Sequence, residues 1–324
     1  MSESDLEIAI VPVQSGALAR RGSASLARRG LSDLLSIESA QHFFEMALQA
    51  RAENRFTDFF QYLQRTVALD PLHLDAIDWL GLAYYDGQGA SRDYTQAAMH
   101  FRKAADHGHP KAQYHMGVIY ERGHGVAQYP SRAASWYRRA AEQGNALAQY
   151  RLGGWYYWGN GVPKDRTQST FWYLKAADQG LAIAQIELGR LHLCGDGVPE
   201  DHIEAARWYR KAADQGHADA QYRLGIMYMK GESLLPPDPI QAEAWFRKAA
   251  GQGDKAAERR LGLMYQYGEG VPRDPRQAAE WYRKAADRGD AVAQRNLGEM
   301  YSKGEGVPRD PIRAAEWLRR AAEQ

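Results

Sequence analysis

The chain has one cysteine, Cys194, among 324 residues, and it has no long hydrophobic run. A single cysteine excludes an intrachain disulfide, so the fold does not depend on an oxidising compartment. No stretch approaches the ~20 apolar residues that span a bilayer. The apolar residues 8–13 are too few for a secretory signal and are interrupted by Pro12. These absences predict a cytoplasmic protein that does not insert into a membrane.

An excess of charge is also lacking, since 41 Lys and Arg face 40 Asp and Glu. A balanced chain has no overall field to attract nucleic acid or an anionic membrane. The ten histidines lack the spacings of zinc sites, and no P-loop or nucleophile elbow occurs. Cys194 has no His or Cys partner at such a spacing, so we interpret it as a small apolar filler. We therefore expect no enzyme, no metal or other cofactor, and no nucleic-acid partner.

The sequence instead has a repeat of 36 or 37 residues, marked by seven glycines. The glycines are Gly81, Gly117, Gly153, Gly189, Gly225, Gly262 and Gly298. An alanine usually stands five residues before each glycine and a tyrosine three after it, which predicts one face of a helix, here called helix A. Glycine within a helix costs ~1 kcal/mol relative to alanine. Seven in register therefore predict that a second helix approaches closely at this point.

A Gly-x-Gly turn and a second helix, helix B, complete each repeat. Helix B is expected to begin with an aspartate N-cap followed three residues later by Gln or Glu, as at Asp274 and Gln277, forming a capping box. The second repeat lacks this pattern at Tyr129, and the fifth carries a proline-rich insertion at 233–237. An aromatic pair before Ala-Ala, such as Trp208-Tyr209, predicts a core between helices rather than a base-stacking platform.

The repeat pattern, as it stands in residues 293–322, resembles the Sel-1-like repeat, a relative of the tetratricopeptide repeat. The resemblance implies a right-handed α/α solenoid that serves as an adaptor or scaffold, in bacteria often in signalling, envelope biogenesis or host interaction. It also implies peptide or protein binding as the mode of action. Secreted members often carry a cysteine pair in each repeat, and the lack of such pairs here favours the cytoplasm.

The expected organisation has three parts. Residues 1–36 are interpreted as a disordered tail, with a basic docking motif or a phosphorylation site at Ser23 or Ser32 as the alternative. Residues 37–72 are expected to form a capping hairpin of tetratricopeptide type. Seven repeats fill 73–324, with boundaries at 73–108, 109–144, 145–180, 181–216, 217–253, 254–289 and 290–324.

A partner is expected in the concave groove that the A helices of such repeats line. The candidate contacts lie three residues before the helix-A glycine or one, four or five after it, which is one stripe at helical spacing. They are Tyr85, Tyr114, Tyr150, Tyr157, Trp158, Ile186, Arg190, Tyr222, Met229, Arg259 and Arg295. Tyr157 and Trp158 are the best candidates for a partner anchor. Tyr114, Tyr150 and Tyr222 have a structural role as their alternative interpretation.

Charges at the two ends of this stripe are expected to orient the ligand. Asp75, Asp78 and Asp86 would meet basic residues, and Arg259 and Arg295 acidic ones. The favoured function is a scaffold or adaptor, with a dedicated inhibitor or immunity protein as the alternative. Self-association is expected through an apolar edge in the last repeat, formed by Trp317, Leu318 and Ala321.

Overall fold

The computed structural model describes residues 31–231 and 237–323. Within these residues it contains helices α2 to α17 and no strand. Residues 1–30, and with them the possible phosphorylation site at Ser23, lie outside the described residues, as does the insertion of the fifth repeat except Pro237. The chain divides into an N-terminal unit, Met1–Ala127, and a C-terminal unit, Gln128–Gln324, which are described separately.

The N-terminal unit holds the capping hairpin, the first repeat and helix A of the second. Its helices are α2 (Leu31–Ala52), α3 (Phe56–Leu69), α4 (Leu74–Asp86), α5 (Tyr94–Asp106) and α6 (Pro110–Arg122). Phe59 and Leu63 of α3 are fully buried and pack with Ala76 and Leu80 of α4. The expected tail was too long, because residues 31–36 belong to α2.

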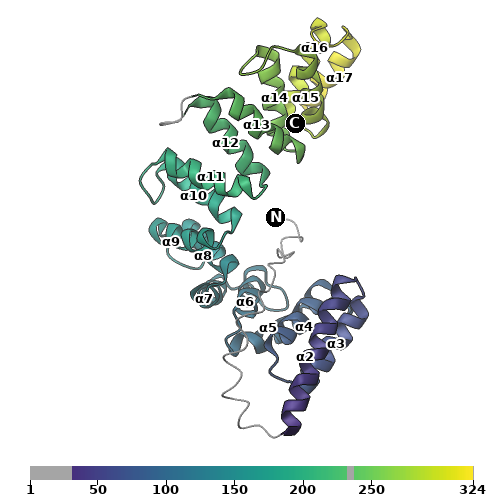
Figure 1. Cartoon of the computed structure of the whole chain (residues 1–324), viewed down its shortest axis with the longest axis vertical. Coiled ribbons are helices and arrows are strands. Elements are labelled where there is room, and N and C mark those ends of the chain that lie inside the picture. Colours follow the sequence, from purple (N-terminus) through teal and green to yellow (C-terminus); the bar gives the residue numbers. More distant parts are fainter. Residues whose placement is uncertain (1–30, 232–236, 324) are drawn as a thin grey trace. The chain divides into compact units, whose positions relative to one another are not determined.

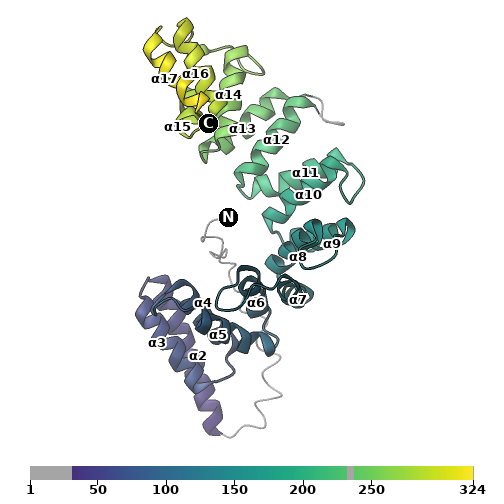
Figure 2. The ribbon, with the colours of Figure 1, turned by 180° about the vertical axis from the view of Figure 1, so that it is seen from behind.

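The C-terminal unit continues the same alternation of helices A and B, which Figures 1 and 2 show as successive helical hairpins. Its A helices are α8 (Ala146–Trp158), α10 (Ala182–Cys194), α12 (Ala218–Lys230), α14 (Lys255–Tyr267) and α16 (Ala291–Lys303). Its B helices are α7 (Pro130–Glu142), α9 (Arg166–Asp178), α11 (His202–Asp214), α13 (Pro239–Gly251), α15 (Pro275–Asp287) and α17 (Pro311–Ala322). The predicted class, an α/α solenoid of helical hairpins, is confirmed.

The helix-A glycines lie where helix B approaches most closely, as the sequence predicts. A Cβ atom at Gly262 would lie 2.6 Å from Cδ1 of Tyr282, and one at Gly189 would lie 2.7 Å from Cε1 of Tyr209. Both tyrosines are fully buried. The glycine and the second aromatic of helix B form the same packing contact in the first and in the third to sixth repeats.

Helix B begins with the predicted aspartate N-cap. Oδ1 of Asp274 accepts hydrogen bonds from the backbone N–H groups of Arg276 and Gln277, at 3.0 and 3.2 Å. The reciprocal bond of a capping box was wrongly predicted, since the backbone N–H of Asp274 donates to the carbonyl oxygen of Tyr265 in helix A, at 2.8 Å. The cap therefore joins the two helices of a repeat. Tyr129 makes no side-chain cap at the start of α7, as expected.

The helix-B tryptophans differ in burial. Trp136, Trp208 and Trp245 are buried, which confirms the prediction for these three, whereas Trp172, Trp281 and Trp317 are half-buried. Trp208 of α11 packs in a cluster with Tyr173 of α9 and Leu188 of α10. Trp208 thus packs between helix A of its own repeat and helix B of the repeat before it.

The last repeat presents the predicted apolar residues more openly than the others. Leu318 packs on Gly298 as Tyr209 packs on Gly189 and Tyr282 on Gly262, but it is 39% exposed, whereas the two tyrosines are fully buried. Trp317 and Ala321 are half-buried. Self-association through this edge stays a prediction.

Candidate protein-binding surface

The candidate contacts of the A helices, here called the A-helix stripe, differ widely in exposure. Trp158 and Arg295 are exposed. The half-buried members are Tyr150, Ile186, Arg190, Tyr222, Met229 and Arg259. Tyr157 in the C-terminal unit, and Tyr85 and Tyr114 in the N-terminal unit, are buried.

Tyr157 of α8 is held by polar contacts on several sides. Its hydroxyl donates to Oδ2 of Asp196 at 2.7 Å and accepts from Nη1 of Arg190 at 3.2 Å. The guanidinium of Arg166 lies 3.4 Å from the centre of its ring and pairs with Asp196 at 3.1 Å. Tyr157 thereby links the third repeat to the turn that follows helix A of the fourth.

Tyr85 plays the same part in the N-terminal unit. It stands four residues after its glycine, as Tyr157 does, and its hydroxyl lies 2.8 Å from Nδ1 of His124. His124 and Asp196 are both the middle residue of a Gly-x-Gly turn in the following repeat. Tyr94 stacks on the ring of His124 at 4.3 Å, and Arg122 donates to the Tyr85 hydroxyl at 3.3 Å. Two repeats therefore use this tyrosine to connect neighbours.

These contacts correct part of the sequence analysis. Exposed aromatic rings were expected at Tyr85, Tyr114 and Tyr157, whose exposed fractions are 6%, 4% and 8%. The pattern did not reveal their burial because the partners of Tyr85 and Tyr157 lie 33–39 residues away, in other repeats. Replacing Tyr157 together with Trp158 should consequently lower stability, contrary to the expectation that both are free of the core.

Trp158 is the most exposed aromatic side chain among the described residues, at 70%. It is the last residue of α8, and Gly159 ends the helix in the left-handed conformation, with φ +80°. Its ring meets that of Tyr157 edge to face, with 4.8 Å between centroids. The exposed indole of Trp158 thus packs against a tyrosine whose position is fixed by two arginines and a carboxylate.

The two outer tyrosines of the stripe are intermediate cases. Tyr150 lies 5.6 Å from the ring of Tyr173, and Tyr222 lies 5.8 Å from that of Phe246, between ring centroids. Both help to cover the core, in line with the structural alternative, and both remain partly accessible. Ile186 packs beside the core of α11 and α12, and Met229 beside that of α13 and α14.

The charges expected at the ends of the stripe are largely paired. Asp78 is 3% exposed and contacts Nδ1 of His115 at 2.8 Å, so it is not available to a ligand as expected. Asp75 contacts Nε2 of His109 at 3.2 Å, and this hydrogen bond lowers the pKa of the Asp75 carboxyl. In the C-terminal unit, Arg259 lies 3.7 Å from Asp290.

A ladder of arginine–tyrosine contacts between repeats went unnoticed in the sequence. Arg138 donates to the Tyr156 hydroxyl at 2.6 Å, and Arg283 to that of Tyr301 at 2.9 Å. Arg210 with Tyr228 and Arg247 with Tyr265 make the same bond. Between α9 and α10 both positions differ, with Leu174 for the arginine and His192 for the tyrosine. The constant separation of 18 residues was the signal available in the sequence.

A second ladder consists of glutamines. Nε2 of Gln221 donates to the carbonyl oxygen of Ala213 at 3.1 Å, and its Oε1 accepts from Nε2 of Gln252 at 2.9 Å. Gln149 and Gln185 make equivalent pairs of bonds. Each glutamine thus connects the helix B before it with the helix B of its own repeat.

No group of three or more His, Cys, Asp or Glu side chains in the described part could hold a metal ion. Cys194 is exposed, so its interpretation as a small apolar filler was wrong. Among the helices of residues 31–231 and 237–323, none is both long and apolar enough to cross a membrane.

Comparison with known proteins agrees with the repeat geometry. The Sel1 repeat model matches residues 74–109, 110–145, 146–181, 182–217, 218–254, 255–290 and 291–324. The chain belongs to the Sel1 repeat family. Each matched repeat begins one residue after the boundary expected from the glycine spacing. Comparison with curated proteins found no match.

Solved structures of Sel1 repeat proteins resemble the chain. A Sel1 repeat protein from Oxalobacter formigenes is 32% identical, with a TM-score of 0.66 over 76% of this chain and 96% of that one. A protective antigen present in uropathogenic Escherichia coli strains, which displays an SLR fold, is 28% identical over 91% and 80% of the two chains, with a TM-score of 0.47.

An immunity protein from Pseudomonas aeruginosa is also similar, at 20% identity over 77% of this chain and 81% of that one, with a TM-score of 0.41. A likeness of this degree does not favour an inhibitory role over a scaffold role. Sel1 repeat proteins act as protein-interaction scaffolds and are typically not enzymes.

Proposed function

We propose that this chain is a scaffold that binds a segment of another protein along the A-helix stripe of its C-terminal unit, with Trp158 as the central contact. The exposed indole of Trp158 carries the proposal. Tryptophan is among the residues that contribute most to protein interfaces when it becomes buried by a partner. Folding leaves this one 70% exposed.

The surroundings of Trp158 favour a preorganised contact. Its neighbour Tyr157 is fixed by Arg166, Arg190 and Asp196, so the base of the indole has little freedom to move. A side chain that is already ordered loses less conformational entropy when a partner covers it. Burying most of an exposed tryptophan would then contribute directly to affinity.

The remaining contacts of the proposed surface lie on the neighbouring A helices of the same unit. Tyr150, Ile186, Tyr222 and Met229 are half-buried, so each presents part of its apolar surface. Tyr85 and Tyr114 are left out of the proposed contact set because they are buried. Arg295, which is exposed, would favour an acidic residue in the ligand.

The test is a comparison of captured proteins and their affinities. Wild-type chain and Trp158→Ala should be used as baits, with bound proteins identified by mass spectrometry and the affinity measured with the purified partner. Trp158→Ala should weaken binding of the partner by ~2 kcal/mol or more and leave the melting temperature of the chain nearly unchanged. Loss of the partner's own catalytic activity in the complex would indicate an inhibitor instead of a scaffold.

Ile240→Ala provides the matched control. Ile240 is 71% exposed, like Trp158, but lies at the start of the B helix α13. It should leave the affinity within about twofold, because it lies off the A-helix stripe. Equal affinities for wild type and Trp158→Ala, or an equal loss in Ile240→Ala, would contradict the proposal.

A further inference from the structure

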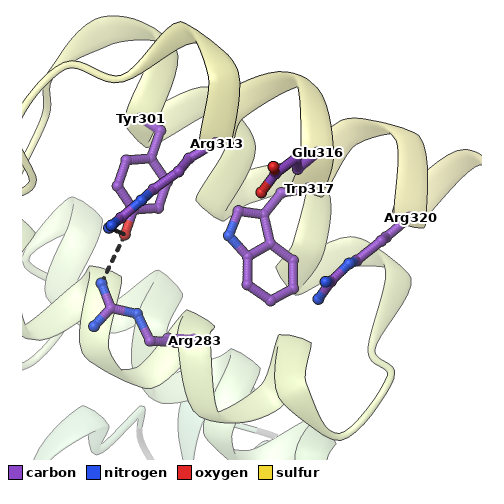
Figure 3. A pocket seen from close by; sticks show the side chains of 6 residues that line it. All are labelled: Arg283, Tyr301, Arg313, Glu316, Trp317 and Arg320. Carbon is purple, nitrogen blue, oxygen red and sulfur yellow. Dashed lines mark hydrogen bonds between the residues drawn. The ribbon is translucent and has the colours of Figure 1, made fainter.

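An open pocket of about 300 Å³ lies in the last two repeats, away from the A-helix stripe. Helices α15, α16 and α17 contribute its lining residues Arg283, Tyr301, Arg313, Glu316, Trp317 and Arg320 (Figure 3). Three of these six side chains are guanidinium groups. The pocket therefore combines positive charge with two aromatic rings.

Two of the guanidinium groups converge on one atom. Arg283 donates to the Tyr301 hydroxyl at 2.9 Å and Arg313 donates to the same oxygen at 3.5 Å (Figure 3). Arg320 lies over the Trp317 ring, 4.7 Å from its centre. Like charges held this close raise the local potential and favour an anion between them.

Within the part of the chain that the structure describes, carboxylates balance these positive charges only in part. Among the described residues, neither Arg283 nor Arg320 has a carboxylate within 4.0 Å. Arg313 lies 3.4 Å from Oδ2 of Asp310, whose Oδ1 already caps α17. Glu316 is the single acidic residue of the lining.

The preceding repeat shows what the pocket lacks. There Arg247 occupies the position of Arg283, and Glu243 pairs with it and accepts a hydrogen bond from Tyr265 at 3.2 Å. Thirty-six residues after Glu243 stands Ala279, and Arg313 takes the position of Gln277. Compared with its counterpart one repeat earlier, the pocket therefore lacks a carboxylate, at Ala279 of α15, and has an additional guanidinium, at Arg313 of α17.

We propose that this pocket binds a carboxylate of an acidic peptide segment, at the place that Glu243 fills in the preceding repeat. Arginine binds carboxylates through paired N–H groups, which suits two converging guanidinium groups. Glu316 favours a peptide over a phosphate, because a peptide also brings N–H donors for this carboxylate. The balanced charge of the whole chain likewise gives no attraction for a polyanion such as nucleic acid.

The probe is the peptide acetyl-Glu-Leu-Glu-Glu-Leu-Glu-amide, labelled for fluorescence anisotropy, with its all-Gln counterpart as the uncharged control. The full chain should bind the acidic peptide and not the control, and Arg313→Gln should weaken binding at least tenfold. Binding should also weaken as salt rises from 0.1 to 0.5 M. The Trp317 indole N–H signal, assigned with Trp317→Phe, should shift in an NMR titration of indole-labelled protein.

Arg247→Gln is the matched variant, because it removes the same ladder arginine one repeat earlier, where Glu243 already neutralises it. It should leave peptide affinity within about twofold. Equal binding by Arg313→Gln, an equal loss in Arg247→Gln, or no shift of the Trp317 indole at millimolar peptide would overturn the proposal. A stronger shift with inorganic phosphate than with peptide would assign the pocket to phosphate instead. Trp158→Ala should not affect any of these readouts, which separates this site from the A-helix stripe.

Discussion

Glu258 and Arg288 replace a pair of glutamines in the ladder between repeats, with 3.3 Å between Oε1 of Glu258 and Nε of Arg288. Glu258 is 1% exposed, and its Oε2 has no hydrogen-bond partner among the described residues. In repeats two to five and seven the glutamine at this position donates to an alanine carbonyl eight residues earlier, as Gln294 does to Ala286. An ionised carboxylate has no proton to donate, so this bond is missing in the sixth repeat.

We predict that Glu258→Gln stabilises the protein by about 1 kcal/mol at neutral pH, because the amide restores the missing bond and still accepts from Arg288. Burial raises the pKa of Glu258, against the opposing charge of Arg288. A raised folded pKa gives stability that is present below the unfolded value and is lost as the pH rises through the folded value. The advantage of glutamine should therefore grow from acid to neutral pH.

Urea unfolding at a series of pH values from 4 to 8 measures both effects. Glu280→Gln is the control, since it makes the same change at an exposed position of α15. It should change the free energy of unfolding by less than about 0.5 kcal/mol. A Glu258→Gln variant that is less stable than wild type at pH 7 would show that the ion pair outweighs the missing bond.

The arginine–tyrosine ladder has a gap that can be repaired. Leu174 and His192 occupy the two positions between α9 and α10, and Nδ1 of His192 is buried without a hydrogen-bond partner among the described residues. Leu174→Arg combined with His192→Tyr should stabilise the protein more than the sum of the single changes, with a coupling of ~0.5–1 kcal/mol. A double-mutant cycle by chemical denaturation measures it. Strict additivity would indicate that the ladder contributes nothing to stability.

Burial distinguishes two tryptophans of the same sequence motif. Trp208 is 7% exposed within the core of the fourth repeat, whereas Trp317 is half-buried in the last one. Trp208→Ala should cost ~3–5 kcal/mol through lost contacts and the cavity left behind. Trp317→Ala should cost clearly less because it loses less buried surface. Thermal melts of the two variants test the difference, and equal melting temperatures would contradict it.

Most of the fold was predictable because each repeat restates the same local rules. The glycine of helix A, the aspartate cap and the aromatic pair recur at one spacing, so the sequence predicts the close approach of a second helix at Gly262, where a Cβ atom would lie 2.6 Å from Tyr282. Helix α2 was placed too short because no repeat constrains its start at Leu31. The reciprocal hydrogen bond of the capping box was wrongly predicted, because the backbone N–H of Asp274 donates across the turn to the carbonyl oxygen of Tyr265. Helix-capping rules do not contain this contact.

The candidate surface was less predictable, because helical spacing assigns a side chain to a face but not to a partner. Trp158 and Tyr157 are adjacent in sequence and equally aromatic, yet one is 70% exposed and the other 8%. The difference comes from Arg190 and Asp196, which belong to the next repeat and reach the hydroxyl of Tyr157. Contacts of this kind depend on how successive repeats stack, which no single repeat reveals.

Tyr157 provides the final prediction, because its hydroxyl can be removed while its ring is kept. The hydroxyl donates to Asp196 and accepts from Arg190, and the ring supports Trp158. Tyr157→Phe should lower the free energy of unfolding by about 1–2 kcal/mol, because it leaves a part-buried carboxylate and guanidinium with fewer partners. Tyr222→Phe is the control for stability alone, since no hydrogen bond of its hydroxyl occurs among the described residues.

Tyr157→Phe should also lower the affinity for the partner that Trp158 binds. The loss should be smaller than for Trp158→Ala, because the indole remains and only the ring beneath it is held less firmly. Chemical denaturation and binding measured on the same samples separate the two effects. An unchanged stability would mean that the hydroxyl contacts contribute nothing, and a loss of affinity as large as that of Trp158→Ala would make Tyr157 itself a contact residue.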